Sequence, residues 1–251
     1  EAVLGKGGID LLNKEVIVYS RKGDNGAYFG LNTLRYFGAV NAKAYHGGLD
    51  EWKAAGKPVE TAVATLPPVA LKLKPKAGVV LWNDEMMARV RDGKTQIVDA
   101  RTPKEYAGDD VRAIRGGHVP NAVNIPYEQN WTDPGTAAKL ARKEVKTRDG
   151  MSLKPREDLM KLYGGLDPNK EVVVYCQSGV RASQTATVLR DLGFTDVKVY
   201  EPSWLGYAGV LSAPAANETF LNVGALNGRM VSLQGRVDEL EAELEKVKAK
   251  R

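Results

Sequence analysis

One unit occurs twice in this sequence, and the repeat constrains the fold more than any other feature. Residues 15–52 and 171–207 both read as a Glu, a β-branched run that ends in Tyr, a loop, a helix with Leu-Arg near its end, and a short strand that again ends in Tyr. With one extra residue in the first loop, the copies stay in register over about 37 positions. Strands that alternate with helices are typical of an α/β fold with a mostly parallel sheet. We therefore predict two versions of one α/β unit in tandem.

Further predicted elements precede the second copy only. Helix-start and helix-stop residues indicate helices over 83–93, with an Asn cap, and over 154–165. Residues 95–101 and 122–126 read as buried strands. Only 14 residues precede the first copy. We expect either that the chain is a fragment or that another segment completes the first sheet, because half a parallel sheet leaves apolar edges bare.

The segment between the copies has a different character. Residues 58–78 contain four prolines and no helical period, which is typical of a linker. The sequence therefore predicts a partial unit, a linker, a complete unit and a C-terminal helix, over 1–57, 58–77, 78–212 and 219–251.

The C-terminal segment carries a heptad stripe. Val or Met fills most a positions and Leu most d positions, through Val223, Leu226, Met230, Leu233, Val237, Leu240, Leu244 and Val247. In a parallel pair of helices, Arg236 would meet Glu241 and Glu243 would meet Lys248, and both contacts join opposite charges. Two glycines on the outer face oppose the helix by about 1 kcal/mol each. We predict a coiled coil and a homo-oligomer formed through 223–247; the alternative is a single helix packed on its own domain.

Composition limits the classes of function. The chain has 251 residues, 43% of them hydrophobic, and a formal charge of +5 in which basic and acidic residues are interspersed. This excess suits small anionic ligands, and we expect no nucleic-acid partner. One cysteine and two histidines exclude an internal disulfide and argue against a metal site, so we expect neither metal nor cofactor. No apolar run approaches the roughly 18 residues of a membrane span.

The single cysteine lies where a strand-like run meets a predicted helix, in "VVVYCQSGVRASQ" (172–184). The thiolate of a cysteine at this position is stabilised by free backbone N–H groups and by the helix dipole. Gln177 and Ser178 are small or polar and let the backbone curl around the sulfur, and Gly179 can adopt a conformation that is costly for other residues. Arg181 can fold back and add a positive charge.

The alternative is that Cys176 is an ordinary buried small hydrophobe, which is the usual state of a lone cysteine in a strand. The repeat argues against it, because Ser20 occupies the matching place in the first copy. A serine there has no base to activate it, so we expect the first copy to be non-catalytic and to shape the neighbouring surface.

Four motifs in order resemble the rhodanese sulfurtransferases. "CQSGVR" is similar to their six-residue active-site loop, and the other three are "IVDARTPKEYAG" (97–108), "GGHVPNAVNIP" (116–126) and "YEPSWLGY" (200–207). Asn121, Glu201 and Pro202 depart from the family pattern. "AYHGGLDEWKAAGKPVET" (44–61) is similar to the close of the non-catalytic first domain in two-domain members of the thiosulfate and 3-mercaptopyruvate type. The resemblance covers about residues 1–212.

The resemblance implies a rhodanese-like three-layer α/β domain, in tandem, and covalent sulfur transfer. The cysteine would take the outer sulfur of an anionic donor such as thiosulfate, carry it as a persulfide, and pass it to cyanide or a thiol. Cys176 and Arg181 would be catalytic, within the loop Gln177, Ser178, Gly179 and Val180. The spacing of five residues from Cys to Arg is one shorter than in cysteine-dependent phosphatases, which favours sulfur over phosphate.

The resemblance also implies supporting residues. Asp99 and Arg101 would brace the loop, and His118 would be structural. The family's substrate-binding Arg is replaced by Glu105, so Arg112 and Arg115 are the candidate replacements, although both could be solvated loop residues. Trp204 would line the pocket or pack in the core.

Two hypotheses remain at this point: a sulfurtransferase enzyme, or a rhodanese-like module that carries sulfur or docks a partner protein with little turnover on small donors. The intact Cys176 and Arg181 favour the enzyme, whereas the missing substrate arginine keeps the carrier open. The sequence begins without a Met. We expect a bacterial periplasmic protein because multi-domain relatives are often exported, with the cytoplasm as the alternative.

Overall fold

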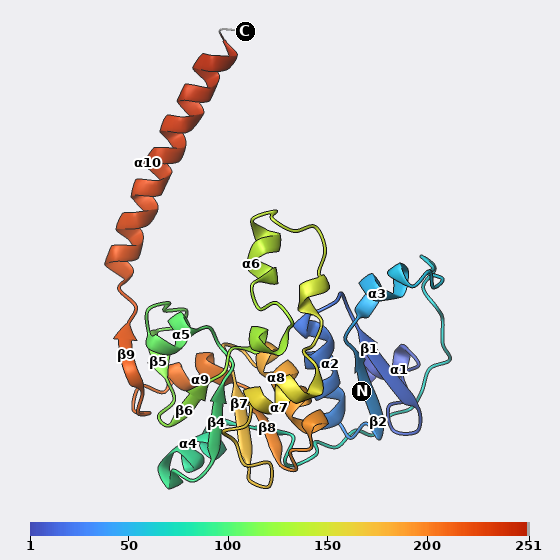
Figure 1. Cartoon of the computed structure of the whole chain (residues 1–251). Coiled ribbons are helices and arrows are strands. Elements are labelled where there is room, and N and C mark those ends of the chain that lie inside the picture. The colour runs from blue at the N-terminus through green and yellow to red at the C-terminus, as the bar shows by residue number, and fades with distance from the viewer. Residues whose placement is uncertain (250–251) are drawn as a thin grey trace.

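The computed structural model describes residues 1–249, and its centre is a five-stranded parallel sheet (Figure 1). All neighbouring strands pair in parallel, in the order β3-β8-β7-β4-β6. Their bounds are β3 Val80–Leu81, β4 Gln96–Asp99, β6 Ala122–Asn124, β7 Val172–Tyr175 and β8 Val197–Tyr200. The carboxyl ends of all five strands therefore meet at one edge, where ligands bind in open parallel sheets.

Strand β7 is buried on both faces, as its continuous apolar sequence predicts. Val172 and Val174 belong to one core cluster, whereas Val173 and Tyr175 belong to the other, because successive side chains point to opposite faces. Helices α7 (Arg156–Leu162) and α8 (Val180–Leu192) cover the first face, and α4 (Asn83–Asp92) and α9 (Ser203–Gly209) cover the second. The result is a helix–sheet–helix sandwich, which confirms the predicted α/β class.

The predicted elements before the second copy are present, with shifted ends. Helix α4 ends at Gly93, whose φ of 65° forms the left-handed cap. The cap at its start is wrong in the sequence prediction: Trp82 precedes the helix, and Asn83 lies inside it and accepts a hydrogen bond from the Tyr200 hydroxyl at 2.7 Å. Helix α7 is shorter than predicted because Pro155 occupies its N-cap.

The first copy and the residues before it form a smaller lobe, and the elements of the first copy follow the same order as those of the second. It contains α1 (Ala2–Lys6), β1 (Glu15–Tyr19), α2 (Asn25–Tyr36), β2 (Asn41–Tyr45) and α3 (Gly48–Ala54). Strands β1 and β2 pair in parallel, as β7 and β8 do. Helix α2 packs against α8, and Arg190 of α8 donates a hydrogen bond to Asn32 of α2 at 3.4 Å.

The segment 58–77 has no helix or strand and runs along the first lobe. The N–H of Val69 donates to the carbonyl of Gly5, and the N–H of Lys76 donates to the carbonyl of Tyr36.

The C-terminal region begins differently from the prediction. Strand β9 (Ala216–Phe220) pairs antiparallel with β5 (Arg115–His118), so strand pairing continues past residue 212 and the helix cannot begin at 219. Helix α10 (Val223–Lys248) has no buried residue and extends away from the body (Figure 1). Residues 250–251 of the predicted helix lie outside the described part of the chain.

Four short elements complete the described structure: α5 (Pro103–Ala107), α6 (Thr136–Ala141) and the 3-10 helices η1 (Tyr127–Asn130) and η2 (Asp149–Met151). Within residues 1–249, no helix combines the length and the apolar character that a membrane crossing requires.

Candidate active site

Cys176 lies at the carboxyl end of β7, in the middle of the sheet, and four residues before α8 begins. Its side chain is 1% exposed and packs in the apolar cluster between the sheet, α7 and α8. The thiol is therefore removed from bulk water, at the edge of the sheet where parallel-sheet proteins bind ligands.

Ser203 fixes the shape of the loop after Cys176. Its hydroxyl oxygen accepts hydrogen bonds from the N–H groups of Cys176 (3.2 Å) and Gly179 (2.9 Å), and its O–H donates to the carbonyl of Tyr200 (2.8 Å). Ser203 is fully buried and has a φ of 50°, which is uncommon for a residue with a side chain. Ser203 lies within the motif "YEPSWLGY" (200–207), but the sequence did not predict its role in the loop.

The other amides of the loop remain free. Within residues 1–249, the N–H groups of Gln177, Ser178, Val180 and Arg181 donate to no protein acceptor. Gly179 adopts a φ of 81°, as its predicted special conformation requires, and turns the chain into the N-terminus of α8. Free N–H groups at a helix N-terminus favour an anion, so the loop can hold a thiolate or a persulfide.

Arg181 is bound by Glu105 rather than free. Its two terminal nitrogens donate to the two carboxylate oxygens of Glu105 at 2.8 and 2.7 Å. Burial alone would raise the pKa of Glu105, but the hydrogen bonds and charge of Arg181 outweigh it and hold that pKa at about 2. Burial lowers the pKa of Arg181, but the hydrogen bonds from Arg181 to Glu105 and the charges of Glu105 and the Cys176 thiolate outweigh this effect and raise it. Arg181 thus lies near the sulfur with its charge balanced.

A second carboxylate faces this pair. Burial raises the pKa of Glu128, the charge of Arg181 lowers it, and that of Glu105 raises it, so Glu128 lies near both residues. One of its carboxylate oxygens is buried without a hydrogen-bond partner among the described residues. The neighbouring Tyr127 ring lies 5.9 Å from the Arg181 guanidinium carbon. The Glu105 carboxylate also lies 3.9 Å from the Arg112 guanidinium, so carboxylates offset the positive charge of both arginines near the loop.

Asp99 and Arg101 form a buried pair at the end of β4, beside β7. Asp99 accepts hydrogen bonds from the backbone and guanidinium of Arg101 and from the Tyr175 hydroxyl (2.6 Å). Arg101 also donates to the carbonyl of Gly117 at 2.7 Å, and its guanidinium carbon lies 4.6 Å from the Trp204 ring. These contacts tie β4, β7 and α9 together beneath the loop, as expected of residues that brace it.

Arg115 and Trp204, two of the candidate substrate-binding residues, are both buried. The Arg115 guanidinium is buried and donates to the carbonyls of Ala208, Ala213 and Val210, so it has little capacity left for an anionic ligand. Trp204 is buried too, and its indole N–H donates to the carbonyl of Arg115. Both residues pack α9 onto the sheet.

Arg112 remains near the loop. It is half exposed, pairs with Asp110 at 2.8 Å, and its carbonyl accepts a hydrogen bond from the Gln177 side chain at 2.9 Å. His118 donates a hydrogen bond from Nδ1 to the carbonyl of Tyr106, and its ring stacks on the Tyr106 ring with 3.6 Å between centroids.

In a comparison with known proteins, residues 83–209 match the rhodanese-like domain family. A thiosulfate sulfurtransferase of Corynebacterium glutamicum is 31% identical over 79% of this chain and 65% of its own length. The sulfur carrier protein TtuD of Thermus thermophilus is 28% identical over 80% of this chain and 70% of its own length.

The crystal structure of the 3-mercaptopyruvate sulfurtransferase SseA of Escherichia coli superimposes with a TM-score of 0.66 at 24% identity, and the match covers 81% of this chain and 71% of SseA. That likeness shows the fold, and the names of the relatives support sulfur transfer as the general chemistry. The predicted family is thereby confirmed: this chain belongs to the rhodanese family.

Proposed function

We propose that this protein is a sulfurtransferase that carries sulfane sulfur as a persulfide on Cys176. The observation that supports it most is the pairing of a buried thiol with four free loop amides at the N-terminus of α8. Such amides stabilise an anionic sulfur both before and after it is loaded.

Thiosulfate is the donor we propose first, because relatives carry that name. The Cys176 thiolate attacks the outer sulfur of thiosulfate, the S–S bond of the donor breaks, and sulfite leaves with the electron pair of that bond. Cyanide then attacks the outer sulfur of the persulfide and leaves as thiocyanate, which restores the thiolate. Arg112 is the candidate for contact with the donor, since its side chain is half exposed whereas that of Arg181 is mostly buried and bound by Glu105.

A second candidate is a sulfur carrier with little turnover on small molecules. The Glu105 carboxylate favours it, because it binds Arg181 and lies 3.9 Å from Arg112, which weakens the attraction of both arginines for a doubly charged donor. The relative named as a sulfur carrier protein belongs to the same group of matches.

One experiment tests both candidates. The intact mass of the protein is measured after excess thiosulfate and again after cyanide. A gain of roughly 32 Da that cyanide removes rapidly supports the enzyme through covalent catalysis on Cys176. A gain that persists in cyanide supports the carrier, and no gain with thiosulfate, 3-mercaptopyruvate or a small persulfide would refute both.

We also propose that the first lobe is part of a non-catalytic rhodanese-like unit in tandem with the catalytic one. The matching order of β1, α2, β2 and α3 with β7, α8, β8 and α9 supports this. Limited proteolysis tests it: cleavage within 58–77 should precede cleavage within 78–212, and the reverse order would contradict the proposed boundary.

We propose that α10 forms a parallel coiled-coil dimer with a second copy. All eight residues of its heptad stripe are exposed, and the opposite charges of Arg236 and Glu241 would meet across the pair. Light scattering at micromolar concentration should give a dimer, and Leu233→Asp should give a monomer. A wild-type monomer would contradict the proposal.

A further inference from the structure

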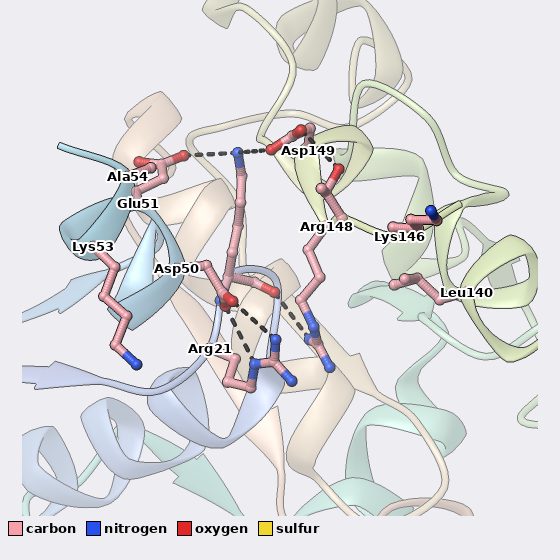
Figure 2. Close-up of a pocket in the computed structure, with 11 residues that line it drawn as sticks. Arg21, Asp50, Glu51, Lys53, Ala54, Leu140, Lys146, Arg148 and Asp149 are labelled. Atoms are coloured by element: carbon pink, nitrogen blue, oxygen red, sulfur yellow. Dashed lines mark hydrogen bonds and ion pairs between the residues drawn. The ribbon is translucent and has the colours of Figure 1, made fainter. Parts of the chain in front are cut away.

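A separate cavity lies where the first lobe meets the catalytic unit. Its volume is about 590 Å³, and it is lined by the loop after β1, by α3, and by the segment between α6 and η2. Figure 2 shows its charged side chains from both sides of this junction. None of the residues of the Cys176 loop lines it.

The lining carries more positive than negative charge. Five cationic and three anionic side chains surround the cavity. The carboxylates already have partners: Asp50 binds Arg21 at 2.9 Å, and Glu51 and Asp149 lie 2.8 and 3.8 Å from the Lys22 ammonium.

The other three cations, Lys53, Lys146 and Arg148, have no carboxylate within salt-bridge distance in the described part of the chain. An excess of two positive charges therefore faces the cavity.

Two of the guanidinium groups converge on one side of it. Arg148 is held in place by a hydrogen bond from its Nη1 to the carbonyl of Lys22 at 3.0 Å. The pKa of Asp50 is lowered chiefly by its hydrogen bond from Arg21, with a contribution from the charge of Arg148, so both arginines lie near this carboxylate. Lys53 and Lys146 lie on opposite sides of this group (Figure 2).

Two backbone N–H groups of the first loop are already bound to carboxylates. The N–H of Lys22 donates to the carboxylate of Asp50 at 2.9 Å, and the N–H of Gly26 donates to that of Asp24 at 2.7 Å. A ligand in the cavity would therefore be held by side chains, and an arginine fork is suited to phosphate and carboxylate groups.

We propose that this cavity binds a small molecule with at least two negative charges, carried by phosphate or carboxylate groups. Its volume falls within the range of small-molecule sites, roughly 300–1,000 Å³. The inference is independent of the sulfur chemistry, because it uses none of the residues around Cys176.

Isothermal titration of the full chain with pyrophosphate tests the proposal, with citrate as the carboxylate probe and sodium chloride added to keep the ionic strength constant. We expect saturable binding. Lys53→Gln with Lys146→Gln should weaken it roughly fivefold, since each exposed charge contributes modestly. Asp149→Asn removes a negative charge and should strengthen it by about twofold.

The matched control is Lys14→Gln with Lys94→Gln, two exposed lysines outside the cavity, and it should leave the dissociation constant unchanged. Equal weakening in this control would show a general charge effect and overturn the proposal. Absence of saturable binding with either anion would also overturn it, as would binding of an acidic peptide alone, because the occupant would then be a protein segment.

Discussion

The loop after β7 and the loop after β1 occupy matching places in two copies of one unit, yet they use their backbone amides in different ways. In the second copy, the N–H of Trp204 donates to the carbonyl of Cys176; in the first, the N–H of Leu49 donates to that of Ser20. The frames of the two loops therefore correspond. After β7, several amides stay free beside a thiol. After β1, side-chain carboxylates accept hydrogen bonds from two of the loop N–H groups, those of Lys22 and Gly26.

Two substitutions between the copies explain the difference. Ser203 and Gly48 occupy matching positions, and both have a positive φ, 50° and 54°. The serine hydroxyl ties down two loop amides and leaves the rest free, whereas the glycine has no hydroxyl to offer. Leu205 is matched by Asp50, whose carboxylate binds the first loop directly. The loop proposed to be reactive thus differs from the first loop in its thiol, in the hydroxyl beneath it and in the absence of the Asp50 carboxylate.

Replacing the thiol should have the largest effect. Cys176→Ser copies the first loop and should abolish the mass gain of roughly 32 Da expected from activated-cysteine chemistry. Adding Ser20→Cys to that variant should not restore it, because carboxylates already accept from two N–H groups of the first loop and the hydroxyl of Ser203 has no counterpart there. Mass spectrometry after thiosulfate measures both, and restored loading would break the comparison.

Removing the hydroxyl beneath the loop should come next. Ser203→Ala leaves the N–H groups of Cys176 and Gly179 without their acceptor, and the misplaced loop should slow sulfur loading roughly 10- to 100-fold. Stopped-flow or quenched mass measurements give the rate constant. Ser203→Gly should behave in the same way, whereas an unchanged rate in both variants would show that the hydroxyl does not position the loop.

The first loop offers the converse test. A Cβ on Gly48 would lie 2.3 Å from the carbonyl oxygen of Ser20, so Gly48→Ala should destabilise the first lobe by about 2 kcal/mol. Urea unfolding followed by circular dichroism reports it. Gly56→Ala is the matched control, because Gly56 has a φ of 65° but open space around it, and it should cost less. Equal losses would mean that the close approach is unimportant.

Releasing Arg181 should have a smaller effect of opposite sign. Glu105→Gln frees the guanidinium charge for a dianionic donor and should raise the rate constant of thiosulfate loading roughly fivefold at low salt. Glu157→Gln, an exposed residue on α7, is the charge-matched control. A slower rate in Glu105→Gln would show that Glu105 is needed to orient Arg181.

The same variant should change acid stability. The pKa of Glu105 is lowered to about 2 in the folded protein. Its contribution to the stability of the fold is therefore complete above its ordinary pKa and is lost as the pH falls from there to about 2. Urea unfolding between about pH 5 and pH 3 should therefore show a weaker pH dependence in Glu105→Gln than in the wild type. Identical slopes would contradict the ion pair.

Local patterns were sufficient for much of the fold. The buried run of β7, the glycine that stops α4, and the special backbone of Gly179 all follow from short-range rules, and the structure contains each of them. The prediction failed where distant segments meet. Strand β9 exists because it pairs with β5 about a hundred residues earlier, and no local signal marks that partner.

The site divides in the same way. The sequence by itself determined where Cys176 and its loop lie, because one strand–loop–helix unit places them, and the family resemblance implied Asp99 and Arg101 beside them. Only the tertiary structure decided which charges are free: Arg115 is used by the carbonyls of α9 and its flanking loop, and Arg181 is held by Glu105 from α5. The physical reason is that a side chain's charge depends on the partner that burial brings to it, and that partner comes from elsewhere in the chain.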